Sequence, residues 1–130
     1  MAQVEGSALV AQAIQREGID VLFGLAGGPI QDIMGFAPHF GVRPIGVHHE
    51  QAATFAAAAY GYVKNQVGVA VLAAGPGVTN GVTGAHVAYD NCFPLVILGD
   101  LVPSGRATRA PSRRRRTFPC SRASPRWRYR

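Results

Sequence analysis

The chain has 130 residues, of which 48% are hydrophobic and 15% are charged, and its formal net charge is +6. This composition excludes a wholly disordered chain and predicts one ordinary domain with a core of its own. The charge is unevenly distributed, because residues 1–105 hold three basic and seven acidic residues, whereas residues 106–130 hold ten arginines and no acid. The first segment is therefore mildly acidic, and the basic character belongs to the second segment alone.

Features of targeting and of metal binding are missing from this sequence. The two cysteines lie one in each segment and have no metal-ligand spacing. The N-terminus lacks the basic-then-apolar order of a signal peptide, and no apolar run approaches the ~18 residues that span a bilayer. We expect a cytoplasmic protein with reduced thiols and no membrane partner.

Helical patterns alternate with short apolar runs between Ser7 and Asp100. Helical spacing, a leading proline or a high alanine content predicts helices at 7–17, 29–41, 50–65 and 78–91. Short apolar runs, typical of strands buried on both faces, lie at 20–24, 43–47, 68–74 and 94–100. This alternation predicts an α/β domain in which a parallel sheet carries helices on both faces.

Three loops follow the first three expected strands: "GLAGGP" at 24–29, "HHE" at 48–50 and "AAGPG" at 73–77. The carboxyl ends of parallel strands share one edge, where ligands bind, so we expect these loops to converge. Taken singly, each loop has an explanation without a ligand. The glycines suit tight turns, and Glu50 suits the positive end of a helix dipole. The histidines at 39, 48, 49 and 86 have no zinc-like spacing, and Cys92 is expected to be a packed thiol.

Taken together, the segments "GLAGGPIQDIM", "IGVHHEQAATFAAAAYGYVKN" and "VAVLAAGPGVTNGVTGAHVAYDNCFPLVILGD" resemble the N-terminal, pyrimidine-binding domain of thiamine diphosphate-dependent enzymes. The resemblance runs from about Ser7 to Asp100. It is greatest to the acetolactate synthase-like group, and "NCFP" favours 2-hydroxyacyl-CoA lyases and oxalyl-CoA decarboxylases.

The resemblance implies a catalytic role for Glu50 at a desolvated dimer interface. Its carboxylate would hydrogen-bond the N1′ nitrogen of the cofactor's aminopyrimidine and so promote loss of the thiazolium C2 proton. The same resemblance implies that the pyrimidine pocket is lined by Gly28, Pro29, Pro76, Gly77 and Asn80. It gives His49 no role.

In the family that this sequence resembles, a separate C-terminal domain with a Gly-Asp-Gly … Asn motif holds the diphosphate and magnesium. That motif does not occur in this sequence. We therefore expect a catalytically incomplete half-site for thiamine diphosphate, belonging to a lyase or synthase that acts on 2-keto acids or 2-hydroxyacyl-CoA. We expect its partner to be a second copy of the chain or a separate diphosphate-binding domain, and we expect no metal ligand within the chain itself.

The arginine-rich segment 106–130 has no apolar period, so we place the domain boundary at 105 and predict no fixed structure beyond it. Three explanations stay open: an out-of-frame reading of GC-rich coding sequence, a basic arm, or the natural terminus of a split enzyme's subunit. The first is favoured, because ten arginines without a lysine are unusual for a binding arm. The alternative function is a non-enzymatic α/β module that binds nucleic acid or acidic partners through this segment, with a steep salt dependence and no need for Glu50.

Overall fold

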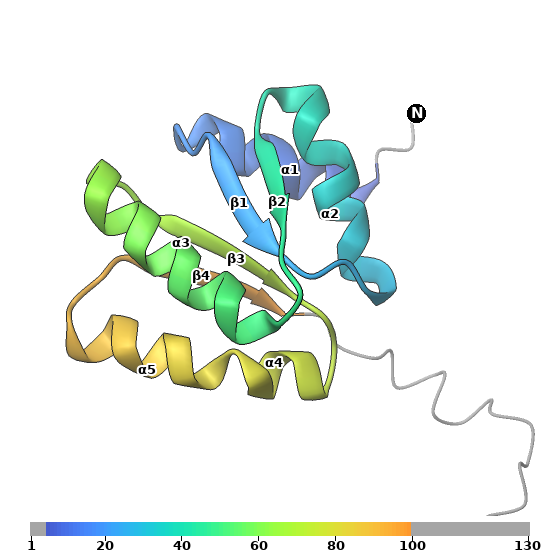
Figure 1. Ribbon diagram of the computed structural model, residues 1–130. Helices are drawn as coiled ribbons and strands as arrows, with labels where there is room; N and C mark the ends of the chain where they lie inside the picture. The colour runs from blue at the N-terminus through green and yellow to red at the C-terminus, as the bar shows by residue number, and fades with distance from the viewer. Residues whose placement is uncertain (1–4, 100–130) are drawn as a thin grey trace, which may run out of the picture.

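The computed structural model describes residues 5–99 (Figure 1). The arginine-rich segment lies outside the described residues, so its expected lack of fixed structure stays a prediction. The α-helices are α1 (Gly6–Arg16), α2 (Gln31–Phe36), α3 (Glu50–Lys64), α4 (Pro76–Asn80) and α5 (Val82–Asp90). The 3-10 helices are η1 (Gly28–Ile30) and η2 (Ala37–Phe40), and the strands are β1 (Val21–Gly24), β2 (Arg43–Gly46), β3 (Gly68–Leu72) and β4 (Leu95–Gly99).

The four strands form one parallel sheet in the order β2-β1-β3-β4. Helices α1 and α2 lie on one face of the sheet, and α3 and α5 lie on the other (Figure 1). The prediction of an α/β domain with a parallel sheet and helices on both faces is confirmed. Within residues 5–99, no helix is long and apolar enough to cross a membrane.

Side chains alternate between two cores along each central strand. Leu22, Val69 and Val71 pack in the cluster beneath α1 and α2. Their neighbours Phe23 and Leu72 pack in the cluster beneath α3. Because both faces of β1 and β3 are covered, these strands read as continuous apolar runs in the sequence.

Helix α3 lies very close to β3, which accounts for its alanine-rich sequence. Ala57 of α3 is fully buried, and a Cβ placed on Gly68 of β3 would overlap the Ala57 carbonyl oxygen. A Cβ placed on Gly61 would lie 2.5 Å from the Gly68 nitrogen. Residues without large side chains on both elements therefore bring the backbones of helix and strand into direct contact.

Two of the expected helices are interrupted. The segment expected as one helix at 29–41 is divided into η1, α2 and η2, and the end of α2 is explained by Pro38, which lacks the N–H that would continue an α-helix. The segment expected at 78–91 starts earlier, at Pro76, and is divided at Gly81 into α4 and α5. A Cβ on Gly81 would overlap Leu72 of β3, so this break is a point of close contact with the sheet.

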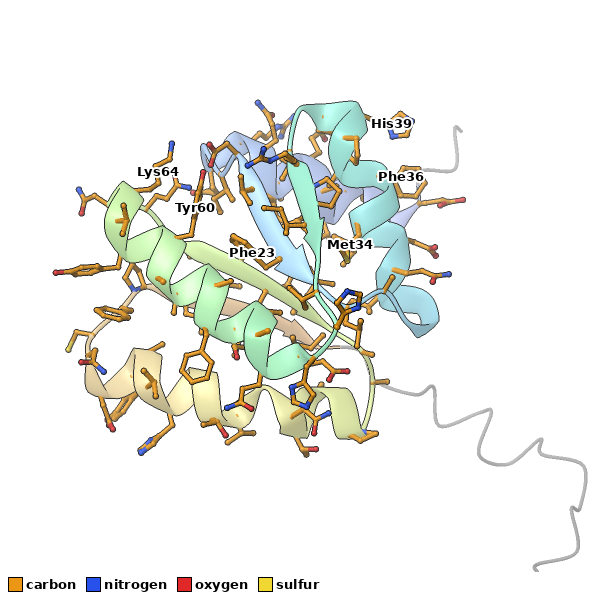
Figure 2. All side chains as sticks on the ribbon, in the orientation of Figure 1. Phe23, Met34, Phe36, His39, Tyr60 and Lys64 are labelled. Carbon is orange, nitrogen blue, oxygen red and sulfur yellow. The ribbon has the colours of Figure 1, made fainter. Side chains whose placement is uncertain are left out.

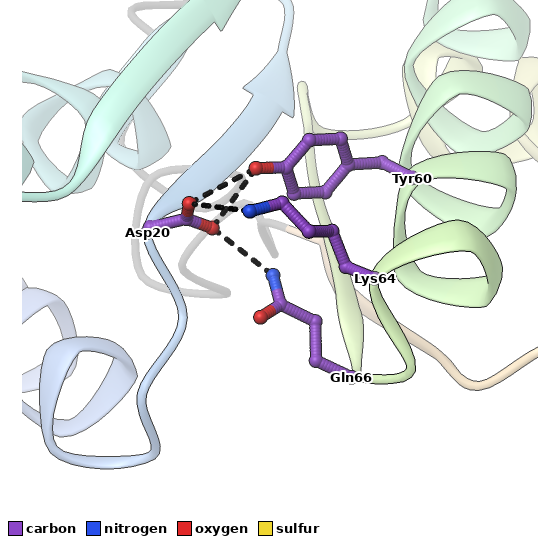
Figure 3. A network of polar contacts seen from close by, with 4 residues as sticks. All are labelled: Asp20, Tyr60, Lys64 and Gln66. Atoms are coloured by element: carbon purple, nitrogen blue, oxygen red, sulfur yellow. Dashed lines mark hydrogen bonds and ion pairs between the residues drawn. The ribbon is translucent and has the colours of Figure 1, made fainter.

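A polar cluster, here called the Asp20 clamp (Asp20, Tyr60, Lys64 and Gln66), lies at the amino end of β1 (Figure 3). The Asp20 carboxylate accepts hydrogen bonds from the Tyr60 hydroxyl and the Gln66 amide, each at 3.0 Å, and Lys64 Nζ lies 3.6 Å away. The Gln66 amide is the largest of the contacts that hold the pKa of Asp20 below its ordinary value. The Tyr60 ring also packs edge-on against Phe23 beneath α3 (Figure 2). The clamp therefore fixes the end of α3 against the start of the sheet.

Candidate functional site

The loops that follow β1, β2 and β3 meet at one edge of the sheet, as the sequence predicts. The Val47 amide donates to the Gly24 carbonyl at 2.9 Å, which joins the second loop to the first. A Cβ on Gly27 would lie 3.2 Å from the Ala73 Cβ, so the first loop also contacts the third. Strand order reverses between β1 and β3, and ligands of parallel sheets bind at the carboxyl edge where this reversal occurs.

Glu50 is the first residue of α3, and only 6% of its surface is exposed. Its Oε2 atom accepts a hydrogen bond from Asn80 Nδ2 at 3.0 Å. Its Oε1 atom lies above Gly77, 2.7 Å from the position that a Cβ would occupy there. Within residues 5–99, Oε1 accepts no hydrogen bond from another residue. One oxygen of a buried carboxylate is therefore held, and the other is free to accept from a ligand.

Hydrogen bonding keeps Glu50 ionised although it is buried. The Asn80 carboxamide is the largest of the contacts that hold the Glu50 pKa below its ordinary value, followed by the backbone amide of Glu50 itself. Burial acts in the opposite direction and is outweighed. At neutral pH the free Oε1 atom therefore belongs to a carboxylate anion.

His49 starts the helix that carries Glu50. Its backbone is extended, with φ −154° and ψ 138°, and its Nδ1 atom accepts a hydrogen bond from the Gln51 amide at 3.2 Å. This N-cap satisfies one of the amides that the first turn leaves unpaired. Sequence reasoning gave His49 no role, and its place in the structure is that of a helix cap.

Three glycines, here called the glycine seam (Gly77 of α4, Gly81 between the two helices and Gly84 of α5), face the first two turns of α3. Their spacing of four and three residues places them on one side of the helical segment. A Cβ on Gly84 would overlap the hydroxyl of Thr54, which is fully buried and donates to the Gln51 carbonyl at 3.0 Å. The seam therefore lets α4 approach α3 until the Asn80 side chain meets Glu50.

The structure brings three of the predicted site residues into contact: Glu50, Gly77 and Asn80. The other three lie in the same loops, where Gly28 and Pro29 belong to η1 and Pro76 begins α4. Gly28 has φ +60°, a conformation that favours glycine. They make no hydrogen bond to Glu50 within the part of the chain that the structure describes.

Sequence reasoning missed Gly27 and Ala73, which join the first and third loops. Both stand inside motifs that the sequence marks as strand ends, but nothing in the motifs indicates which residues touch. Among residues 5–99, no three histidine, cysteine, aspartate or glutamate side chains gather closely enough to hold a metal ion.

Comparison with known proteins gives the family. The profile described as "Thiamine pyrophosphate enzyme, N-terminal TPP binding domain" matches residues 4–117. Human 2-hydroxyacyl-CoA lyase 1 is 37% identical over 97 residues, which are 75% of this chain and 17% of the lyase. The acetolactate synthase large subunit IlvG of Mycobacterium tuberculosis is 42% identical over 98 residues, and oxalyl-CoA decarboxylase of Escherichia coli K12 is 34% identical over 106 residues.

One family model thus matches most of the chain, whose parallel sheet carries a buried carboxylate at its carboxyl edge. The chain belongs to the N-terminal thiamine pyrophosphate-binding domains of thiamine diphosphate enzymes, a family that includes lyases, synthases and decarboxylases. The resemblance found in the sequence is confirmed. The chain spans less than a fifth of the length of these relatives, at 17% of the lyase and 18% of the synthase and the decarboxylase.

Proposed function

We propose that Glu50, Gly77 and Asn80 form the pyrimidine half of a thiamine diphosphate site. The observation that carries the proposal is the free Oε1 atom of a buried, ionised Glu50 at the carboxyl edge of the sheet. A carboxylate oxygen in this state accepts an N–H donor more strongly than a neutral group does.

The carboxylate acceptor of Glu50 fits the aminopyrimidine of thiamine diphosphate, a flat ring with a basic nitrogen that can carry a proton and donate it as an N–H. Glu50 would accept the N–H of that ring nitrogen through Oε1. The bare Cα of Gly77 leaves room beside this oxygen, which a Cβ would fill. When bound, thiamine diphosphate supplies a carbon nucleophile for attack on a carbonyl group.

The remaining predicted residues would border the ring. Gly28 and Pro29 from the first loop and Pro76 from the third would approach it through backbone, and together they would limit the access of water to Glu50. Exclusion of water strengthens the contact between the carboxylate and the ring N–H, because a low dielectric weakens screening.

The parent activity and the other half of the site are further parts of the proposal. We infer a lyase or synthase acting on 2-keto acids or 2-hydroxyacyl-CoA, in keeping with the relatives named above. The diphosphate and magnesium would be held by a separate diphosphate-binding domain. That domain would come from a second copy of the chain's parent protein or from another subunit.

Binding of the isolated aminopyrimidine tests the proposal without the diphosphate half. The probe is 4-amino-5-hydroxymethyl-2-methylpyrimidine, titrated into the full chain while backbone amide NMR signals are followed. A ligand of about ten non-hydrogen atoms at ~0.4 kcal/mol per atom binds with a Kd near 1 mM. We expect signal shifts confined to residues 25–29, 47–51 and 73–80.

The matched variants are Glu50→Gln and Glu17→Gln. Glu17 is an exposed residue at the end of α1, so its neutralisation should leave the shifts unchanged. Glu50→Gln should remove them, because the anionic acceptor is lost. Equal shifts in both variants, or no shift in the unaltered chain at ~10 mM probe, ten times the expected Kd, would overturn the proposal.

A further inference from the structure

We propose that Asn80 is a positioning residue for Glu50: its carboxamide fixes Oε2 and so dedicates Oε1 to the N–H of the bound ring. The inference rests on the proposed function only where it says that Oε1 accepts from the bound ring. It assigns Asn80 a role that acts through Glu50 rather than by direct contact with the cofactor.

The direction of the hydrogen bond between Asn80 and Glu50 follows from the charge of Glu50. Asn80 Nδ2 lies 3.0 Å from Glu50 Oε2, and an ionised carboxylate only accepts hydrogen bonds. The amide nitrogen, and not the amide oxygen, must therefore face Glu50. An amide in this orientation favours the anion and disfavours the protonated acid.

The hydrogen bond to Asn80 distinguishes the two oxygens of the Glu50 carboxylate. A carboxylate has two equivalent oxygens, and a side chain on the first turn of a helix can rotate to present either one. The contact with Asn80 removes this freedom for Oε2, and Gly77 provides the space in which Oε1 lies. The two residues belong to the same short helix, α4, so one element both holds and accommodates the carboxylate.

The packing of α4 and α5 against α3 brings Asn80 to Glu50. Asn80 is exposed, and its position depends on the glycine seam, through which α4 and α5 pack against α3. Among residues 5–99, the other ionisable group beside Glu50 is the neighbouring His49, and α4 itself carries no ionisable side chain. The response of Glu50 to changes at position 80 can therefore be separated from other charges.

The test is the titration of Glu50 in the ligand-free full chain. The sequence has three glutamates, Glu5, Glu17 and Glu50, so glutamate labelled with ¹³C at the carboxyl carbon gives three signals, and Glu50→Gln assigns the relevant one. We expect the pH at the midpoint of the Glu50 titration to rise in Asn80→Ala, because the amide that donates to Oε2 is lost. It should rise further in Asn80→Asp, which keeps the shape and adds a like charge.

Thr79→Ala is the matched control, because Thr79 neighbours Asn80 on α4, is exposed and, among residues 5–99, donates only to the Pro76 carbonyl. It should leave the Glu50 midpoint unchanged. A merely structural role of Asn80 would alter thermal stability without this graded response of one carboxyl group. An unchanged Glu50 midpoint in both Asn80 variants would overturn the inference. If Asn80→Ala fails to fold, its three glutamates titrate together, and the Asn80→Asp result decides.

Titration with the aminopyrimidine probe separates this inference from the proposed function. We expect Asn80→Ala to weaken binding by on the order of tenfold, the effect of losing one hydrogen bond to a charged group. If Glu50 responds to position 80 but the unaltered chain does not bind the probe, the proposed function fails and the coupling of Asn80 to Glu50 stands. If the unaltered chain binds the probe but the Glu50 titration midpoint is the same in the Asn80 variants, the positioning role of Asn80 is wrong and the proposed function stands.

Discussion

The contact between α3 and β3 predicts that Gly68→Ala is among the most destabilising substitutions of a single methyl group in this domain. The new Cβ would overlap the Ala57 carbonyl oxygen, far inside the 3.0 Å below which real Cβ contacts essentially never fall. The contacted atom belongs to the backbone of a helix, so no side-chain rotation can relieve the overlap. Helix and strand must separate instead.

The cost follows from that separation. A gap of ~1 Å between packed surfaces forfeits a quarter to a half of each dispersion contact across it. Overpacking of a core costs typically ~1–3 kcal/mol, and contact with backbone places Gly68→Ala at the upper end, near 3 kcal/mol. For a domain of this size each kcal/mol lowers Tm by about 4–8 °C, which gives a fall of about 12–24 °C.

Gly46→Ala is the matched control, because Gly46 also lies in a strand but has no positive φ and, in the part of the chain that the structure describes, nothing within 4 Å of its Cβ position. A glycine replaced at such a position changes stability by less than ~1 kcal/mol and can increase it. Thermal unfolding followed by circular dichroism compares the two variants. A fall in Tm of the same size in both would refute the argument that close approach of α3 makes Gly68 necessary.

Three further predictions concern the surroundings of the two carboxylates, Glu50 and Asp20. Gly77→Ala should displace Glu50 Oε1 and abolish the aminopyrimidine-dependent NMR shifts, while Tm changes by only a few degrees. Because the folded-state pKa of Glu50 lies below its ordinary value of 4.5, Glu50 stabilises the fold above that value and the contribution is lost as pH falls through the lowered pKa. Between about pH 6 and about pH 3, the Tm of Glu50→Gln should therefore fall less than the Tm of the unaltered chain. At the Asp20 clamp, Gln66→Ala should raise the titration midpoint of Asp20 more than Tyr60→Phe does, as followed by carboxyl ¹³C NMR, since the Gln66 amide is the larger cause of its lowered pKa.

Much of the fold could be predicted from the sequence, because strands buried on both faces appear in it as continuous apolar runs. The runs at 20–24 and 68–74 contain β1 and β3, and both strands are fully buried. Glu50 could be placed at the start of a helix from the alanine-rich segment that follows it. The edge where the loops meet followed from the parallel order of the strands.

The contact between Asn80 and Glu50 could not be predicted, because it is tertiary. Residues 78–91 have a continuous helical pattern, and only the docking of Gly81 against the sheet interrupts the helix after Asn80. The resemblance to a family marked Asn80 as a lining residue, whereas the geometry joins it to the carboxylate.

The Asp20 clamp and the carboxylate at Glu50 lie at opposite ends of the same sheet. Strand β1 runs between them with four residues, a length of ~13 Å. Substitutions so far apart and without shared partners add nearly independently. A protein engineer can therefore strengthen the amino end to obtain a more robust scaffold, and leave the carboxyl end free to be redesigned for other ring-shaped ligands.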